Sequence, residues 1–309
     1  MQIKSCQRVC KFGYMKLVKP IILTALASAL VSCDNFEYHP YSVHIDGETA
    51  INVKYTSILE NSGLTPPFKF AFITDTQGAL DDMSDALDII RQRGDIDFII
   101  HGGDQTDFGL PKEFMWCRDM LEDAGLPYVA VIGNHDCLGN GNDTFDYMYG
   151  PENFSFNVGP VHFVCLNTVA LEYDYSHPVP DFEFIQGDIE HIAMLNHNNP
   201  ATITHTIVVM HSRPYDEQFN NNVARPFNHY ITQYPGLGSD DGRIVDESDG
   251  ILNGSMARGF CINGHNHADD IADIYGNGVL YYQCANMAKR TFFVFTVTDD
   301  GYDYEKVVY

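Results

Sequence analysis

Five apolar segments of this chain each end in a short run of polar, potentially metal-binding side chains. In the clearest of them, Val129-Ala130-Val131-Ile132 is followed directly by Gly133-Asn134-His135-Asp136. The other four end at Asp75-Thr76-Gln77, Gly103-Asp104, His211-Ser212 and His265-Asn266-His267. Short apolar runs of this kind are typical of buried strands in α/β sheets, which bind their ligands at the carboxyl ends of the strands. One such run alone is as typical of an ordinary turn, but five together predict a functional site.

Strands and helices are predicted to alternate along the first half of the chain. Strands are expected at 68–74, 97–101 and 129–132, with amphipathic helices at 81–93 and 112–124. Beyond them we expect a hairpin at 154–168, a helix at 181–195, and strands at 204–210, 259–263, 278–283, 291–298 and 304–308. This order predicts an α/β domain with two packed sheets and outer helices.

The first 32 residues have the composition of a targeting segment. They contain five basic and no acidic residues, and their apolar run from Ile21 to Val31 is short for a membrane span. The run ends in Leu30-Val31-Ser32-Cys33, which resembles the lipobox of bacterial lipoproteins. This resemblance implies a signal peptide at 1–32 and a lipid anchor at Cys33, in the cell envelope of a Gram-negative-type bacterium. The alternative is an ordinary secretory peptide. If translation began at Met15, the signal peptide of either type would be shorter and would run from Met15 to Ser32.

The rest of the chain is strongly acidic. The whole sequence has 18 Lys and Arg against 42 Asp and Glu, so residues 33–309 keep 13 basic against 42 acidic ones. Such a body repels nucleic-acid backbones and favours cations as partners. The cysteines after Cys33 form no CxxC pair, which argues against a thiolate zinc site. We predict a tether and N-terminal arm over 33–66 and a catalytic domain over 67–309, with a long loop at 214–250.

In this order, the five polar runs resemble the calcineurin-like metallophosphoesterase superfamily. That family carries the pattern D-x-H, GDxxD, GNHD/E, H and GHxH, and the resemblance here covers about 68–267. It implies a four-layer α-β-β-α sandwich of two mixed β-sheets with outer helices. It also implies two divalent metal ions, and carboxylates with imidazoles suit Mn, Fe, Zn or Ni.

The resemblance assigns metal ligands position by position. Asp104 would bridge the two ions. The first site would be completed by Asp75, Gln77 and His267. The second site would be completed by Asn134, His211 and His265. Two ions held in this way clamp a phosphate and supply a hydroxide for in-line attack.

Catalytic roles are implied by the same resemblance. His135 would be the catalytic imidazole near the leaving-group oxygen, and Asp107 would orient it. Asp136 would brace the loop. Purple acid phosphatases have tyrosine at the position of Asp107, so their iron–tyrosinate type is not expected here. Arg213 and Tyr215, close to His211 in sequence, are candidate substrate-binding residues.

One position departs from the family pattern. The first motif is usually D-x-H, whereas this chain has Asp75-Thr76-Gln77. Glutamine can ligate through its amide oxygen, but it is a weaker donor than imidazole to zinc-like ions. Three interpretations stay open: a first site that favours harder ions such as Mn or Mg, a site filled only when substrate binds, or an impaired enzyme. We favour the first, because the other ligand positions and His135 match the pattern.

These features predict a metal-dependent phosphoric ester hydrolase that cleaves small phosphodiesters or phosphomonoesters. The aromatic and amide residues of 214–250 favour a nucleotide-like or sugar-phosphate substrate. Two alternatives stay open. An anchored enzyme would act on phospholipid headgroups, whereas a degenerate, non-catalytic lipoprotein would bind a phosphorylated or carbohydrate ligand.

Overall fold

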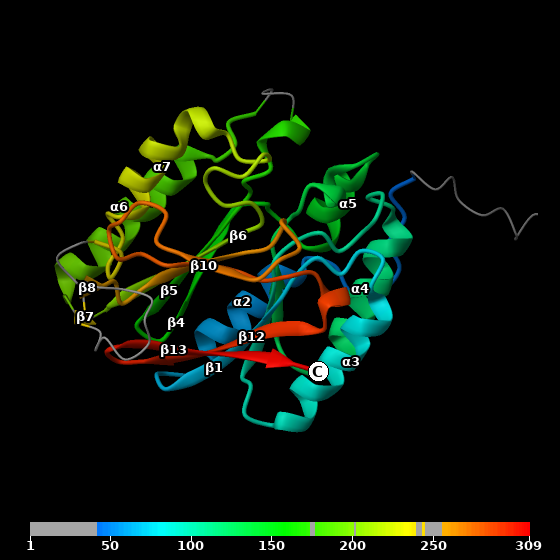
Figure 1. Cartoon of the computed structure of the whole chain (residues 1–309), viewed down its shortest axis with the longest axis horizontal. Helices are drawn as coiled ribbons and strands as arrows, with labels where there is room; N and C mark the ends of the chain where they lie inside the picture. The colour runs from blue at the N-terminus through cyan, green and yellow to red at the C-terminus, as the bar shows by residue number, and fades with distance from the viewer. Residues whose placement is uncertain (1–41, 174–176, 201, 239–242, 245–254) are drawn as a thin grey trace, which may run out of the picture. The chain divides into compact units, whose positions relative to one another are not determined.

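Two β-sheets pack face to face in the centre of the domain, with helices on their outer sides (Figure 1). The computed structural model describes residues 42–173, 177–200, 202–238, 243–244 and 255–309, all of which fall in one compact unit. The predicted signal peptide, the anchor at Cys33 and the first part of the tether lie outside these residues. Among the described residues, no helix is both long and apolar enough to span a bilayer.

The first sheet has five strands in the order β13-β12-β1-β2-β3. They are β1 (Phe68–Ile73), β2 (Phe98–His101), β3 (Tyr128–Ala130), β12 (Thr291–Thr298) and β13 (Gly301–Val308). β1, β2 and β3 are parallel, and the helices α3 (Leu80–Arg93) and α4 (Pro111–Asp123) connect them. Their carboxyl ends therefore meet at one edge of the sheet, where three of the predicted ligand runs follow.

The second sheet has six strands in the order β10-β11-β9-β6-β5-β4. They are β4 (Phe154–Val158), β5 (Val161–Leu166), β6 (His205–Met210), β9 (Phe260–Asn263), β10 (Asp270–Ala272) and β11 (Tyr281–Gln283). β6 and β9 are parallel neighbours, so the other two ligand runs also follow adjacent strand ends. A separate short pair consists of β7 (Arg243–Ile244) and β8 (Ser255–Met256).

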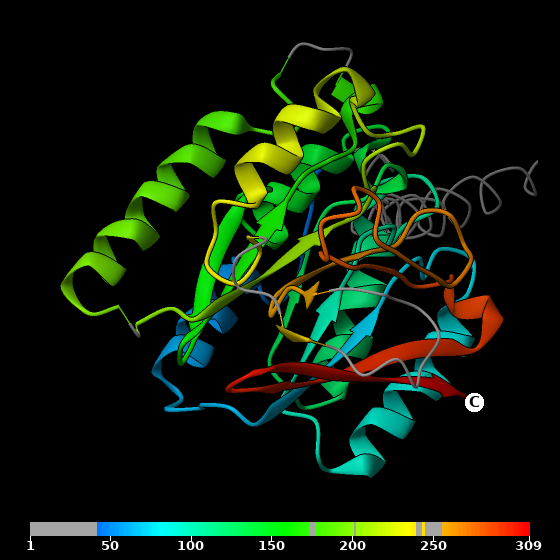
Figure 2. The same ribbon diagram turned by 60° about the vertical axis from the view of Figure 1, so that its left-hand side comes forward.

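Aromatic side chains fill the space between the sheets. Phe70 and Phe98 of the first sheet stack at 5.4 Å, and each meets Phe163 of the second sheet edge-on at 5.7 Å. Two further apolar clusters join α3, α4 and α5 (Gly141–Met148) to the first sheet, and α6 (Phe182–Asn198) and α7 (Ala224–Ile231) to the second (Figure 2). The predicted four-layer sandwich is confirmed.

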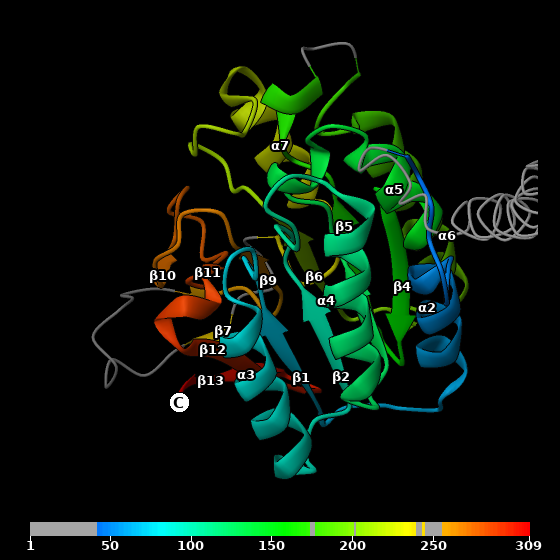
Figure 3. The same ribbon diagram turned by 90° about the vertical axis from the view of Figure 1, so that its right-hand side faces the viewer.

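One edge of the sandwich is closed by a helix that was not predicted from the sequence. α2 (Ile51–Asn61) lies in the predicted N-terminal arm and packs against β3 and β4, the edge strands of the two sheets (Figure 3). The side-chain amide of buried Asn52 bonds both backbone groups of Ala130 at 2.9 Å. It therefore pairs the exposed edge of β3 as a neighbouring strand would.

The structure also contains three elements that were not predicted from the sequence, namely α5, α7 and β10. α7 lies within 214–250, so part of the predicted long loop is helical. Its buried residues Phe227 and Ile231 are four apart and face one side. A helix of eight residues is too short to establish a clear period in the sequence.

A buried hydrogen-bond network joins α6 to the second sheet. Asp188 accepts hydrogen bonds from Ser155 Oγ at 2.6 Å and Tyr234 Oη at 2.8 Å, and it pairs with His162 Nε2 at 2.8 Å. Burial alone would raise the pKa of Asp188, but these bonds and the His162 charge outweigh it and lower the pKa. The folded state therefore favours the ionised carboxylate.

Replacing Asp188 by alanine should destabilise the domain, because the buried His162 and Tyr234 and the half-buried Ser155 would lose their acceptor. The expected loss in the free energy of unfolding is about 3–5 kcal/mol at pH 7, measured by urea denaturation. A carboxylate with a lowered folded pKa stabilises above its unfolded pKa, and this stabilisation disappears as pH falls. The difference between wild type and variant should therefore shrink below about pH 4.

Asp303→Ala on exposed β13 is the matched control and should change the free energy by no more than about 0.5 kcal/mol. A loss for Asp188→Ala that is the same at all pH values would contradict the proposed ionised state.

Candidate metal centre

Backbone hydrogen bonds hold the loops after the strands against one another. Asp75 N, after β1, donates to Gly103 O at 3.0 Å, and Thr76 N donates to Asp104 O at 2.9 Å. Across the sandwich, His265 N donates to the Asp75 carboxylate at 3.1 Å. The loops of both sheets are therefore fixed relative to each other.

Four predicted ligands have left-handed backbone conformations. φ is 53° at Asp75, 56° at Asp104, 77° at His265 and 54° at His267. Only seven described residues other than glycine have positive φ, and Tyr215 is a fifth member of this set from the predicted site. Such strained backbone concentrates at functional sites, because the surrounding structure must hold it there.

Two carboxylates and His211 form a buried cluster, and His267 reaches it from a more exposed position. Ligand atoms of Asp75, Asp104 and His211 lie within 4.8 Å of one another. His211 Nε2 is 3.3 Å from Asp104 Oδ2, and His267 Nε2 is 3.3 Å from Asp75 Oδ1. Each predicted metal site thus has an imidazole nitrogen directed at a carboxylate oxygen.

Asn134 and His265 join the same cluster. Asn134 Oδ1 is 3.1 Å from His211 Nε2 and 3.1 Å from His265 Nδ1. Burial and the neighbouring His211 lower the pKa of His265, which favours the neutral imidazole that metal binding requires. The three non-bridging donors predicted for the second site therefore meet at one point.

A hydrogen bond on the side away from the cluster fixes the orientation of the His211 ring. Its Nδ1–H donates a hydrogen bond to the carbonyl oxygen of Gly102 at 2.8 Å, which leaves Nε2 directed at the cluster. Burial alone would lower the pKa of His211, but the adjacent Asp104 carboxylate outweighs it and raises the pKa to about 10. The cluster therefore attracts positive charge, whether a proton or a metal cation.

Gln77 lies beside two of the other predicted ligands, Asp104 and His267. Its Nε2 is 3.1 Å from Asp104 Oδ2 and 3.2 Å from His267 Nε2. Its Oε1 is buried without a hydrogen-bond partner among the described residues. Rotation of the amide would direct this oxygen at the same two neighbours. The donor set, including this unpaired oxygen, fits a pair of divalent cations.

His135 is held by the backbone rather than by a carboxylate. Its N–H donates to Asp104 Oδ1 at 2.9 Å, and its ring Nδ1 lies 3.0 Å from the main-chain oxygen of Asp107. The Asp107 carboxylate instead accepts from Gly78 N at 3.2 Å. Asp107 thus contacts His135 through its carbonyl group, and its side chain holds the loop after β1.

Asp136 joins two ligand loops. Its Oδ1 accepts from Gln105 N at 2.9 Å and from both Thr106 N and Oγ1 at 3.0 Å, while Oδ2 accepts from Gly133 N at 3.0 Å. All four donors come from the loops that carry Asp104 and Asn134. Asp136 therefore braces these loops, as predicted.

Two buried residues beside the motifs, Thr74 and His101, have supporting roles. Thr74 Oγ1 donates to Asp75 Oδ2 at 2.7 Å. His101 lies between Thr76 Oγ1 and Gly103 N, each at 3.2 Å from a ring nitrogen. Burial lowers the pKa of His101 to about 3, so its ring is neutral. Their only signal in the sequence is that Thr74 directly follows β1 and His101 ends β2.

The two candidate substrate-binding residues differ in their surroundings. Arg213 Nη2 pairs with Asp270 at 2.8 Å, and Arg213 Nε is 3.7 Å from Asp216. Tyr215 is exposed and its ring lies 5.8 Å from that of Tyr275. Arg213 is thus already neutralised by carboxylates, whereas the exposed ring of Tyr215 is available for contact.

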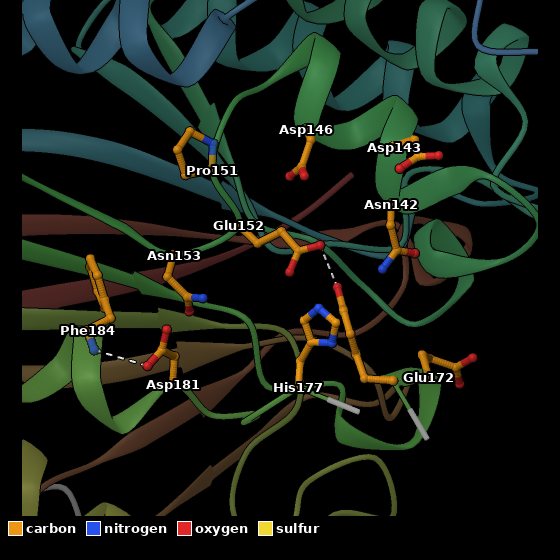
Figure 4. Close-up of a pocket in the computed structure, with 11 residues that line it drawn as sticks. Asn142, Asp143, Asp146, Pro151, Glu152, Asn153, Glu172, His177, Asp181 and Phe184 are labelled. Atoms are coloured by element: carbon orange, nitrogen blue, oxygen red, sulfur yellow. Dashed lines mark hydrogen bonds between the residues drawn. The ribbon is translucent and has the colours of Figure 1, made fainter. Parts of the chain in front are cut away.

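A pocket of about 770 Å³ lies apart from the metal cluster, between α5, the loop before β4, and α6 (Figure 4). Its lining includes five acidic residues, Asp143, Asp146, Glu152, Glu172 and Asp181. Tyr173, also in the lining, lies 4.0 Å from the thiol of Cys137, two residues after His135. Several of the acids have structural partners: Asp181 caps α6, and Glu152 accepts from Tyr173 and Asn167.

Comparisons with known proteins agree with this architecture. A family model described as calcineurin-like phosphoesterase matches residues 68–269. A dimetal phosphatase from Danio rerio has a TM-score of 0.57 at 11% sequence identity, covering 79% of this chain and 100% of that one. A purple acid phosphatase from yellow lupin (Lupinus luteus) seeds has a TM-score of 0.52 at 14% identity, covering 80% of this chain and 53% of that one. These two likenesses show a common fold. No curated protein sequence matches the chain at a significant level.

Replacing Asp136 by asparagine should weaken the contact between the two ligand loops. One accepting carboxylate oxygen would become an NH2 group, which cannot accept the hydrogen bond from the backbone N–H that it faces. We expect the free energy of unfolding to fall by about 1–3 kcal/mol and the bound metal per chain to decrease. Urea denaturation and elemental analysis measure the two effects.

Thr106→Ser is the matched control, since serine keeps the hydroxyl that donates to Asp136. It should retain both stability and metal content. Unchanged metal content in Asp136→Asn would show that the brace is not needed to hold the ligands.

Proposed function

The chain belongs to the calcineurin-like phosphoesterase family, and we propose that it is a metal-dependent phosphohydrolase that cleaves small phosphoesters with two divalent ions. The observation that carries this proposal is the convergence of two buried carboxylates, an asparagine and three histidines from five strand ends. These donors suit divalent cations of the first transition row, such as Mn, Fe, Zn or Ni.

Bound divalent ions would polarise the phosphoryl oxygens and lower the pKa of an attacking water. Asp104 Oδ2 lies 3.3 Å from His211 Nε2 and 3.1 Å from Gln77 Nε2, one residue from each donor set, which supports a shared carboxylate. Asp75 and Asp104 supply the negative charge that keeps cations in a buried setting. The other donors are neutral, so two bound divalent ions would keep a net positive charge that attracts an anionic substrate.

His135 is the candidate for proton transfer. His135 is half-buried, whereas His211 in the cluster is fully buried. The ring of His135 is therefore within reach of a bound substrate. The carbonyl of Asp107 fixes one ring nitrogen and leaves Nε2 for the leaving-group oxygen. A positioned imidazole of this kind contributes rate through proton donation to the departing alkoxide.

We also propose that the enzyme is anchored in the cell envelope through Cys33 and acts there on a soluble phosphoester. The lipobox-like sequence supports the anchor, and the acidic body makes nucleic acid an unfavourable substrate. A phospholipid headgroup remains the alternative substrate. The presence of His135 and Asp107 weighs against a purely binding protein.

His135→Ala should keep its metal and lose about 10²–10⁴-fold in kcat, because only proton transfer is removed. Asn134→Ala should instead lose metal, because it removes a donor that faces two histidines. Chromogenic phosphate monoesters and diesters with Mn²⁺ or Ni²⁺ measure kcat, and elemental analysis measures occupancy.

His191→Ala on the exposed side of α6 is the matched control and should match wild type in both assays. No turnover by the metal-loaded wild type on either ester class would refute the proposed activity. Equal turnover by His135→Ala would refute the role of the imidazole.

The anchor is tested separately. Cys33→Ser should move the protein from the membrane fraction to the soluble fraction, because the lipid acceptor is removed. Detergent phase partitioning with immunoblotting measures the shift, and Cys137→Ser is the control that should stay with the membrane. A wild-type protein found only in the soluble fraction would contradict the anchor.

A further inference from the structure

The two sets of metal donors differ in chemistry. With Asp104 shared, the first set offers oxygen from Asp75 and Gln77 and one imidazole from His267. The second set offers one amide oxygen, from Asn134, and two imidazoles, from His211 and His265. Oxygen donors suit Mg²⁺ and Mn²⁺, whereas imidazoles suit Zn²⁺, Fe²⁺ and Ni²⁺.

The two sets also differ in exposure. The His211 side chain is fully buried, and the His265 side chain is 9% exposed. The His267 side chain, in the first set, is 44% exposed. Solvent therefore reaches the first set far more easily than the second, and an ion there exchanges by a shorter path.

The second set is more firmly oriented. The Gly102 carbonyl fixes the ring of His211, and Asn134 Oδ1 contacts both histidines at 3.1 Å. In the first set, the amide of Gln77 has its nitrogen toward Asp104 and its oxygen unpaired, so it must rotate before the oxygen can ligate. Donors already held in place bind an ion with a smaller loss of conformational entropy.

From these differences we propose that the two sites hold different ions. The second site retains a borderline ion such as Zn²⁺, and the first site takes a harder ion such as Mn²⁺ that exchanges with solvent. Gln77 is the residue that sets this difference, because an imidazole at its position would give each site two nitrogen donors. This inference rests on the proposed two-metal centre and goes further by assigning a preference to each site.

Metal content gives a direct test that does not depend on activity. The full-length protein is stripped with a chelator, incubated with equimolar Zn²⁺ and Mn²⁺, desalted and measured by elemental analysis. We expect about one Zn²⁺ per chain to be retained and Mn²⁺ to be lost on desalting. In a second sample, loaded with one equivalent of Zn²⁺ and then with Mn²⁺, electron paramagnetic resonance should show about one bound Mn²⁺ per chain.

Gln77→His should retain about two Zn²⁺ per chain after the same treatment, because the first site would gain an imidazole donor. Gln186→His, on the exposed side of α6, is the matched control and should retain the same metals as wild type. Two retained Zn²⁺ ions in wild type, or one in Gln77→His, would overturn the proposal.

The result is independent of turnover. Unequal metal retention without hydrolysis of any phosphoester would support the unequal sites and refute the proposed activity. Hydrolysis with two equally retained Zn²⁺ ions would support the activity and refute the unequal sites.

Discussion

The structure depends most on the burial of two carboxylates, Asp75 and Asp104, close to one another at the ends of β1 and β2. Two such charges in a buried setting repel each other strongly, and they are stable there only with hydrogen-bond donors and positive charge around them. Backbone N–H groups of His135 and His265 supply part of this compensation. The left-handed turns at both aspartates make these close approaches possible. The remaining compensation falls to histidines and, in the proposed metal centre, to cations.

Much of the fold was predictable because its strands are short apolar runs with abrupt polar ends. β1, β2 and β3 lie within a few residues of their predicted bounds, and the four-layer arrangement is the one that the family resemblance implied. α2 was not predictable in the same way. Only three of its eleven residues are buried, and its most specific contact is the Asn52 amide on β3. A polar residue that pairs with a strand edge leaves no period in the sequence.

The candidate site was predictable as a set of residues, but the bonds within it were not. Asp107 illustrates the limit: the motif names the residue next to His135, yet the contact is made by its main-chain oxygen. Sequence patterns report which side chains are present. They do not report which atom faces which neighbour, because this depends on the φ and ψ angles of the loops. For the same reason, the sequence does not reveal the hydrogen bonds that Thr74 and His101 make.

The acidity of the body and the proposed activity impose opposite demands on charge. A phosphoester is anionic, and residues 33–309 carry 42 acidic against 13 basic residues, so long-range electrostatics oppose its approach. Arg213, the basic residue nearest the cluster in sequence, is already paired with Asp270. Attraction of the substrate must therefore come from cations within the cluster itself. In this protein the metals would serve binding as well as chemistry, and the site with the weaker hold on its ion would govern both.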